Sequence, residues 1–244
     1  MKKYFLIVVL STFFFSCKKS METLTPIVIN DLYPITVGKT FIYRLDSTLP
    51  INFGASLATK SYQAKDSVES NFMDASGRNS FRIFRYLRDT LGIQPWTFTA
   101  TYYTTIETNK IEYNDNNLRF ITLVNPVSYN TSWKGNAYIN TILPSPFYYF
   151  DNWDYHYTKL DEPFTCIKGN IQNTYTVLQQ NTKVQQGNFN PSFYDEKNYS
   201  IEVYAKGIGL IYKDFIHYTW QPTPAPARFQ DDSWGIRLNL IENK

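Results

Sequence analysis

Short alternations of apolar and polar residues, broken repeatedly by turn residues, constrain the fold of this chain more than any other feature. Phe41, Tyr43 and Leu45 alternate with polar neighbours, and similar segments recur as far as the C-terminus. A two-residue period places the apolar side chains on one face of a β-strand. The sequence therefore predicts an all-β fold, a single antiparallel domain of about ten to twelve strands.

The other predicted strands are rich in Thr, Tyr, Phe, Ile and Val, which favour pleated structure. They are Ser61–Glu69, Ser80–Asp89, Trp96–Thr105, Lys110–Tyr113, Leu118–Val124, Thr131–Asn140 with a turn at Gly135-Asn136, Phe164–Ile167, Thr174–Gln179, Tyr199–Tyr204, Leu210–Thr219 and Trp234–Ile241. Ser80–Asp89 also fits a helix, because Arg78, Arg82, Arg85 and Arg88 would share a helical face, but its β-rich flanks favour a strand. With tight turns and no sustained helix, we expect a curved sheet, a half-barrel or a barrel.

Composition excludes several classes of protein. Aromatic residues make up 18% of the 244 residues, far from the composition of a disordered chain. Mean hydropathy is −0.36, which argues against a polytopic membrane protein. The formal net charge is only +3. Nucleic-acid binding needs a basic surface, so no nucleic-acid partner is expected.

The N-terminus has the organisation of a secretory signal. A basic Met1-Lys2-Lys3 precedes a nearly unbroken apolar run from Tyr4 to Phe15. This run is too short to span a bilayer as a helix and suits the apolar core of a signal peptide. Residues 1–16 are therefore predicted to be a signal peptide. Its removal takes Lys2 and Lys3 away and leaves 22 basic against 21 acidic residues.

Ser16-Cys17 directly follows the apolar run and resembles a bacterial lipobox, with Phe14 where Leu is usual. The resemblance implies that Cys17 is acylated after cleavage and that residues 17–30 form a tether. Two or three acyl chains would hold the protein stably on a membrane. The tether lacks an acidic run typical of surface export, which favours the periplasmic face of the outer membrane. An ordinary secretory peptide with a chance cysteine is the alternative.

Residues 31–244 are predicted to form one β-rich domain, since no second linker or internal repeat interrupts them. Cys166, in the apolar segment Phe164–Ile167, is expected to be a buried thiol. If Cys17 is acylated, Cys166 has no partner for an intramolecular disulfide, although an envelope compartment would permit one.

Several segments resemble a family of Bacteroidetes lipoproteins of unknown function. The opening Tyr33–Tyr43, with the pattern YPxxVGxxFxY, is similar to the start of many such proteins. The stretches 117–124 and 133–138 look like the middle of one group, and YAKGIGLIYK at 204–213 looks like its penultimate hairpin. The resemblance implies an all-β fold and an envelope location. It implies no catalytic residue.

Motifs for chemistry are sparse. His156 and His217 are the only histidines, and neither belongs to a recognisable nucleophile or zinc motif. Adjacent acids at 151/154, 161/162, 195/196 and 231/232 are expected to be solvated loops, although 151, 154 and 161 could also bind calcium. The sequence thus predicts a non-enzymatic protein with no catalytic residue, no metal and no cofactor.

The stretch Phe147–Tyr157 is unusually aromatic and follows Pro144 and Pro146, which indicate a loop. Its rings could simply pack in the core. They could also stack an apolar ligand or a glycan while Asp and Asn side chains orient it. The ligand-binding hypothesis selects Phe147, Tyr149, Trp153, Tyr155 and Tyr157.

Three functions remain open at this stage. The first is a lipid-anchored outer-membrane lipoprotein whose β-domain binds a small apolar or glycan ligand. The second is a structural or partner-binding subunit that contacts another envelope protein. The third is a hydrolase, for which the sequence offers least. A deep apolar cavity would favour the first, and a flat exposed apolar patch the second.

Overall fold

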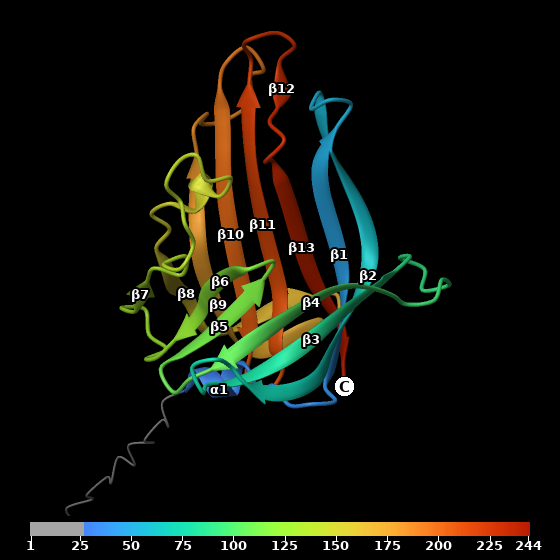
Figure 1. Ribbon diagram of the computed structural model, residues 1–244, viewed down its shortest axis with the longest axis vertical. Coiled ribbons are helices and arrows are strands. Elements are labelled where there is room, and N and C mark those ends of the chain that lie inside the picture. Colours follow the sequence, from blue (N-terminus) through green and yellow to red (C-terminus); the bar gives the residue numbers. More distant parts are fainter. Residues whose placement is uncertain (1–26) are drawn as a thin grey trace, which may run out of the picture.

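The computed structural model describes residues 27–244, which fold almost entirely into β-strands (Figure 1). The strands are β1 (Thr40–Ile51), β2 (Ser56–Met73), β3 (Asn79–Arg88), β4 (Thr97–Ile106), β5 (Lys110–Asp115), β6 (Leu118–Val124), β7 (Ser132–Trp133), β8 (Tyr155–Cys166), β9 (Gly169–Lys183), β10 (Asp195–Ala205), β11 (Gly209–Gln221), β12 (Arg228–Phe229) and β13 (Trp234–Asn243). A helix, α1 (Ile29–Leu32), and a 3-10 turn, η1 (Tyr148–Phe150), are also present. Within residues 27–244, no helix is long and apolar enough to cross a membrane.

All strands belong to one antiparallel sheet, which confirms the predicted fold class. The order is β6-β5-β4-β3-β2-β1-β13-β11-β10-β9-β8-β7, with β12 paired to β11. Most strands pair with their neighbour in sequence, and β13 returns to close the gap between β1 and β11. The sheet has 13 strands, of which β7 and β12 contain only two residues each. The longer strands agree with the predicted ten to twelve.

The sheet curls into a nearly closed barrel. Its first and last strands approach each other where the Ile121 amide of β6 donates to the Gly135 carbonyl at 2.8 Å, just after β7. The Trp133 indole donates back to the Ile121 carbonyl at 2.8 Å. The shorter strands β4, β5 and β6 thereby face the long strands β9, β10 and β11 across the interior (Figure 1).

Two predicted segments differ from the structure. Thr131–Asn140 is a strand only at Ser132–Trp133; the backbone then turns at Gly135-Asn136, as predicted, but does not continue as a strand afterwards. A Cβ on Gly135 would clash with the Tyr155 ring, so the backbone of Gly135 approaches that ring too closely for a residue with a side chain. Conversely, β8 begins at Tyr155, eleven residues before its end at Cys166 and well before the predicted Phe164.

The folded domain also begins earlier than expected. Ile29 and Leu32 of α1 are both 0% exposed and pack in the main core cluster. The expected domain boundary at residue 31 therefore falls inside α1, which lies at the lower end of the sheet in Figure 1. The predicted signal peptide, Cys17 and most of the tether lie outside the described residues.

Cys166 ends β8 as a buried free thiol, which confirms its predicted burial. It packs in a second core cluster with Leu238 and Leu240 of β13 and Ile211 of β11.

Candidate ligand-binding cavity

The barrel encloses a cavity of about 450 Å³ between its short and long strands. This volume lies within the range of small-molecule sites in proteins. It is lined by residues that follow α1, by residues of β1 to β6, by η1 and by residues of β8, β9, β10, β11 and β13. Most of these residues are aromatic or aliphatic, so the cavity offers an extended apolar wall.

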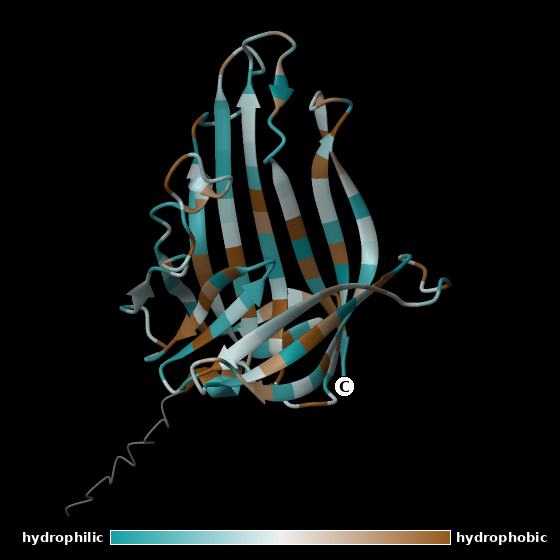
Figure 2. Cartoon of the chain, in the orientation of Figure 1, coloured by the Kyte–Doolittle hydropathy of each residue, from teal (hydrophilic) through white to brown (hydrophobic). Residues whose placement is uncertain are grey.

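The two-residue period explains why these side chains face inward. Phe41 and Tyr43 of β1 both line the cavity, as do Tyr102 of β4 and Tyr113 of β5. Hydrophobic and hydrophilic residues alternate along the long strands in Figure 2. The apolar face that the alternation predicts for each strand is therefore the face that lines the cavity.

The aromatic stretch contributes core rings to this wall rather than an exposed loop. Phe147, Tyr149, Trp153 and Tyr155 line the cavity. Trp153 is 2% exposed and Tyr155 is 1% exposed. Their polar atoms are satisfied within the protein: the Trp153 indole donates to the Tyr149 carbonyl at 2.7 Å, and the Tyr155 hydroxyl donates to Asn136 Oδ1 at 2.7 Å.

Tyr157 lies away from the cavity lining. It is 1% exposed, packs against Trp133, and its hydroxyl donates to the Val124 carbonyl at 2.8 Å. The structure thus brings four of the five predicted ligand-binding residues together around one cavity. Their role in binding stays a prediction.

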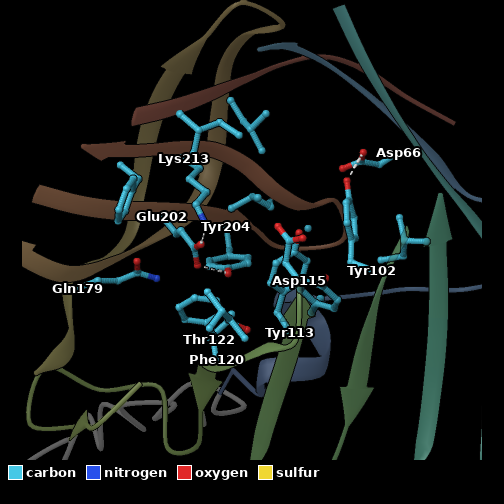
Figure 3. A pocket seen from close by; sticks show the side chains of 18 of the residues that line it. Asp66, Tyr102, Tyr113, Asp115, Phe120, Thr122, Gln179, Glu202, Tyr204 and Lys213 are labelled. Carbon is cyan, nitrogen blue, oxygen red and sulfur yellow. Dashed lines mark hydrogen bonds and ion pairs between the residues drawn. The ribbon is translucent and has the colours of Figure 1, made fainter. Parts of the chain in front are cut away.

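A buried ion pair forms one polar part of the wall. Arg85 of β3 donates to both carboxylate oxygens of Asp66 on β2, at 2.7 and 2.6 Å. The Tyr102 hydroxyl donates to the same carboxylate at 2.5 Å (Figure 3). Burial would lower the pKa of Arg85, but the adjacent Asp66 charge outweighs it and raises that pKa. The guanidinium therefore stays charged inside the barrel.

A second ion pair lies on the long strands. Lys213 of β11 donates to Glu202 of β10 at 2.9 Å, and the Tyr204 hydroxyl donates to the other Glu202 oxygen at 2.6 Å. Nearby, Gln179 of β9 uses its amide oxygen to accept from Ser200. Its amide nitrogen forms no hydrogen bond with another described residue and points towards the cavity in Figure 3.

Asp115, at the end of β5, is the third carboxylate of the lining. Within residues 27–244 its side chain forms neither a hydrogen bond nor an ion pair. Burial raises its pKa, and the charges of Arg85 and Lys213 only partly oppose that effect. Figure 3 shows it between the Lys213–Glu202 pair and the Tyr102–Asp66 pair.

The charged part of the lining is not visible in the sequence, because its members come from five different strands and form no local motif. Nothing in the sequence distinguishes Arg85 from the three arginines near it, yet its side chain is only 12% exposed. The sequence does contain one indication. Asp66 lies on the same face of β2 as Ala64 and Val68, which are 0% and 1% exposed. A charge on the apolar face of a strand indicates a buried partner.

The other arginines of that segment have separate environments. Arg78 pairs with Asp74 and Glu107, and joins Lys110 and Arg119 around the buried Glu112. Arg88 donates to the amide oxygen of Gln63. None of these residues belongs to the cavity lining.

The remaining titratable candidates are dispersed. His217 is a packed histidine, 0% exposed and stacked on Tyr149 at 3.8 Å between ring centroids, with Nδ1 beside Asn198 Oδ1 at 2.7 Å. Asp195 was expected in a solvated loop and is instead 0% exposed, since it begins β10 and accepts from Tyr218. Asp154, just before β8, forms an ion pair with Lys134. Asp161, within β8, accepts a hydrogen bond from the Asn173 side chain.

Comparisons with known proteins find no matching family model and no matching curated protein. Among solved structures, the chain is similar to a candidate lipoprotein from Parabacteroides distasonis, with 11% identity and a TM-score of 0.40. It is also similar to a candidate exported protein with a YmcC-like fold from Bacteroides fragilis, with 9% identity and a TM-score of 0.40. Each match covers 87% of this chain and 98% of the other. At this distance neither match assigns a family or a role to this chain.

Proposed function

We propose that this chain is a lipid-anchored protein of the bacterial outer membrane, on its periplasmic face, whose β-domain binds a small and largely apolar ligand without catalysing a reaction. The observation that carries the proposal is the cavity of about 450 Å³ with its aromatic and aliphatic wall. Transfer of apolar ligand surface from water into such a site contributes about 25 cal/mol per Å².

The rigidity of the wall supports binding. Trp153 and Tyr155 are held by hydrogen bonds to neighbouring backbone and side-chain atoms and by core packing. A preformed site loses little conformational entropy when a ligand enters, so more of the contact energy appears as affinity. The buried position of these rings favours an apolar ligand over a glycan, which would need rings presented to solvent.

The alternative of a partner-binding subunit receives less support from the surface. The three most exposed large apolar residues lie on separate turns: Phe53 between β1 and β2, Leu91 between β3 and β4, and Ile142 before η1. These turns are far apart in Figure 1. A large interface is favoured by a contiguous apolar patch, and these three residues do not belong to one patch.

Filling the cavity should abolish binding. Leu210 lines the cavity from β11, and Leu210→Trp places an indole in the space that a ligand would occupy. We expect the variant to bind the neutral apolar dye N-phenyl-1-naphthylamine at least about tenfold more weakly, equivalent to about 1.4 kcal/mol. Fluorescence titration of the purified protein measures this affinity.

Leu49→Trp is the matched control, because Leu49 is 53% exposed on β1 and lies outside the cavity lining. It should bind the dye as the parent does. Equal affinities for the parent and Leu210→Trp, or no dye binding by the parent, would contradict the proposed function.

The anchor is tested separately. The order of basic residues, apolar run and Ser16-Cys17 supports acylation of Cys17. Cys17→Ala should move the protein from the membrane fraction to the soluble periplasmic fraction or leave it unprocessed, since acyl chains supply the membrane affinity. Fractionation and mass spectrometry of the mature N-terminus make the measurement. An unmodified N-terminal residue in the parent would reject the anchor.

A further inference from the structure

Asp115 is the one carboxylate of the cavity lining that has no partner among the described residues. We propose that the ligand carries an amino group, and that this group binds as an ammonium ion to the Asp115 carboxylate while the rest of the ligand occupies the apolar cavity. This inference rests on the proposed ligand-binding function and names the chemical class of its ligand.

The charge balance of the lining supports a cation. Asp66 pairs with Arg85, and Glu202 pairs with Lys213, which leaves the Asp115 charge without a counter-ion. A buried charge is stable only when it is paired or hydrogen-bonded. An ammonium ion on the ligand completes this balance. An anionic ligand would meet three carboxylates and two cations that already have partners.

The surroundings of Asp115 also suit an ammonium ion. Tyr113 lies two residues earlier on the same face of β5, and its ring packs against Tyr102 with centroids 5.3 Å apart. Faces of aromatic rings attract cations through their quadrupole. A carboxylate beside tyrosine rings therefore offers a charge-assisted hydrogen bond together with cation–π contacts.

A ligand can reach this position from solvent. Asn116 and Asn117 form the exposed turn after Asp115, with φ of 48° and 64°, and Asn116 also lines the cavity. The half-buried Asp115 thus lies where the cavity approaches the surface. The amino end of a ligand would bind near this turn, with its apolar part deeper among the rings.

The test compares three ten-carbon probes, decylamine, decanol and decanoic acid, as competitors of N-phenyl-1-naphthylamine. The parent protein should bind decylamine about tenfold or more tightly than decanol at pH 7, as expected for one charge-assisted hydrogen bond. In Asp115→Asn this preference should fall to within about twofold, with decanol affinity unchanged. Asp154→Asn, which removes an exposed carboxylate outside the cavity, should keep the parent's preference.

Stability provides an independent readout that a misfolded variant would not reproduce. Because burial raises the pKa of Asp115, the folded protein binds more protons than the unfolded chain between the usual Asp pKa and the raised one. The stability contributed by this group therefore falls as the pH rises through that window. At pH 7, ligand-free Asp115→Asn should melt at or above the temperature of the parent while losing the amine preference.

The pH dependence of binding gives a second check. Arg85 from β3, Lys213 from β11, Asp66 from β2 and Tyr113 from β5 are the charged and titratable groups near Asp115. Decylamine affinity should fall as the pH drops through the raised pKa of Asp115, while decanol affinity stays constant. Equal affinity for decylamine and decanol, or a preference for decanoic acid, would overturn the inference and leave the proposed function standing. Failure of all three probes to displace the dye would also overturn it.

Discussion

Trp153→Ala is expected to lower the free energy of unfolding by about 3–5 kcal/mol, the usual cost of removing a buried tryptophan. Trp153 is 2% exposed, and its ring centroid lies 5.0 Å from that of Phe150 and 6.1 Å from that of Phe215. The substitution opens a void and leaves the Tyr149 carbonyl without its indole donor. For a domain of this size the melting temperature should fall by about 6–20 °C.

The control for this prediction is Phe53→Ala, which removes a ring that is 95% exposed. Its effect should stay within about 0.5 kcal/mol. Urea unfolding followed by circular dichroism measures both variants. If Trp153→Ala melts like the parent and loses only dye binding, the ring is a ligand contact with no structural role, and the description of the aromatic stretch as core would be wrong.

Residue patterns located most of the sheet, because strand parity is a local property. Leu118–Val124 matches β6 residue for residue, and the turn around Gly207 joins β10 to β11 as the sequence predicted. The start of β8 was missed for a physical reason. The prolines that precede the aromatic stretch indicated a loop. In the structure, Tyr155 and Tyr157 belong to β8, and both point to the buried side of that strand.

Only part of the cavity lining could be predicted from the sequence. A dense aromatic stretch is visible in the sequence, and four of its selected residues do line the cavity. Its charged members are not visible in this way, because Asp66, Asp115 and Glu202 become neighbours of one cavity only when the sheet curls. The near closure of the barrel depends on contacts between its two edges, such as the hydrogen bond from Ile121 to Gly135. The periodicity of apolar residues along a strand gives no information about such contacts.

Arg85→Met should also cost about 3–5 kcal/mol, because it leaves the Asp66 carboxylate in the barrel without its cation. The two side chains are only 12% and 11% exposed, so water replaces the lost partner poorly. Asp66 would keep the Tyr102 hydroxyl as a donor, but one neutral donor does not balance a buried charge. Equilibrium unfolding in urea at pH 7 measures the loss.

The double variant Asp66→Asn/Arg85→Met separates the charge from the packing. Asparagine keeps an oxygen for the Tyr102 hydroxyl and removes the unpaired charge, while methionine fills much of the volume of the arginine stem. Because breaking a buried pair is costly and removing both charges is often nearly neutral, the double variant should recover most of the stability that Arg85→Met loses. A double variant less stable than Arg85→Met would show instead that the carboxylate itself holds β2 and β4 together through Tyr102.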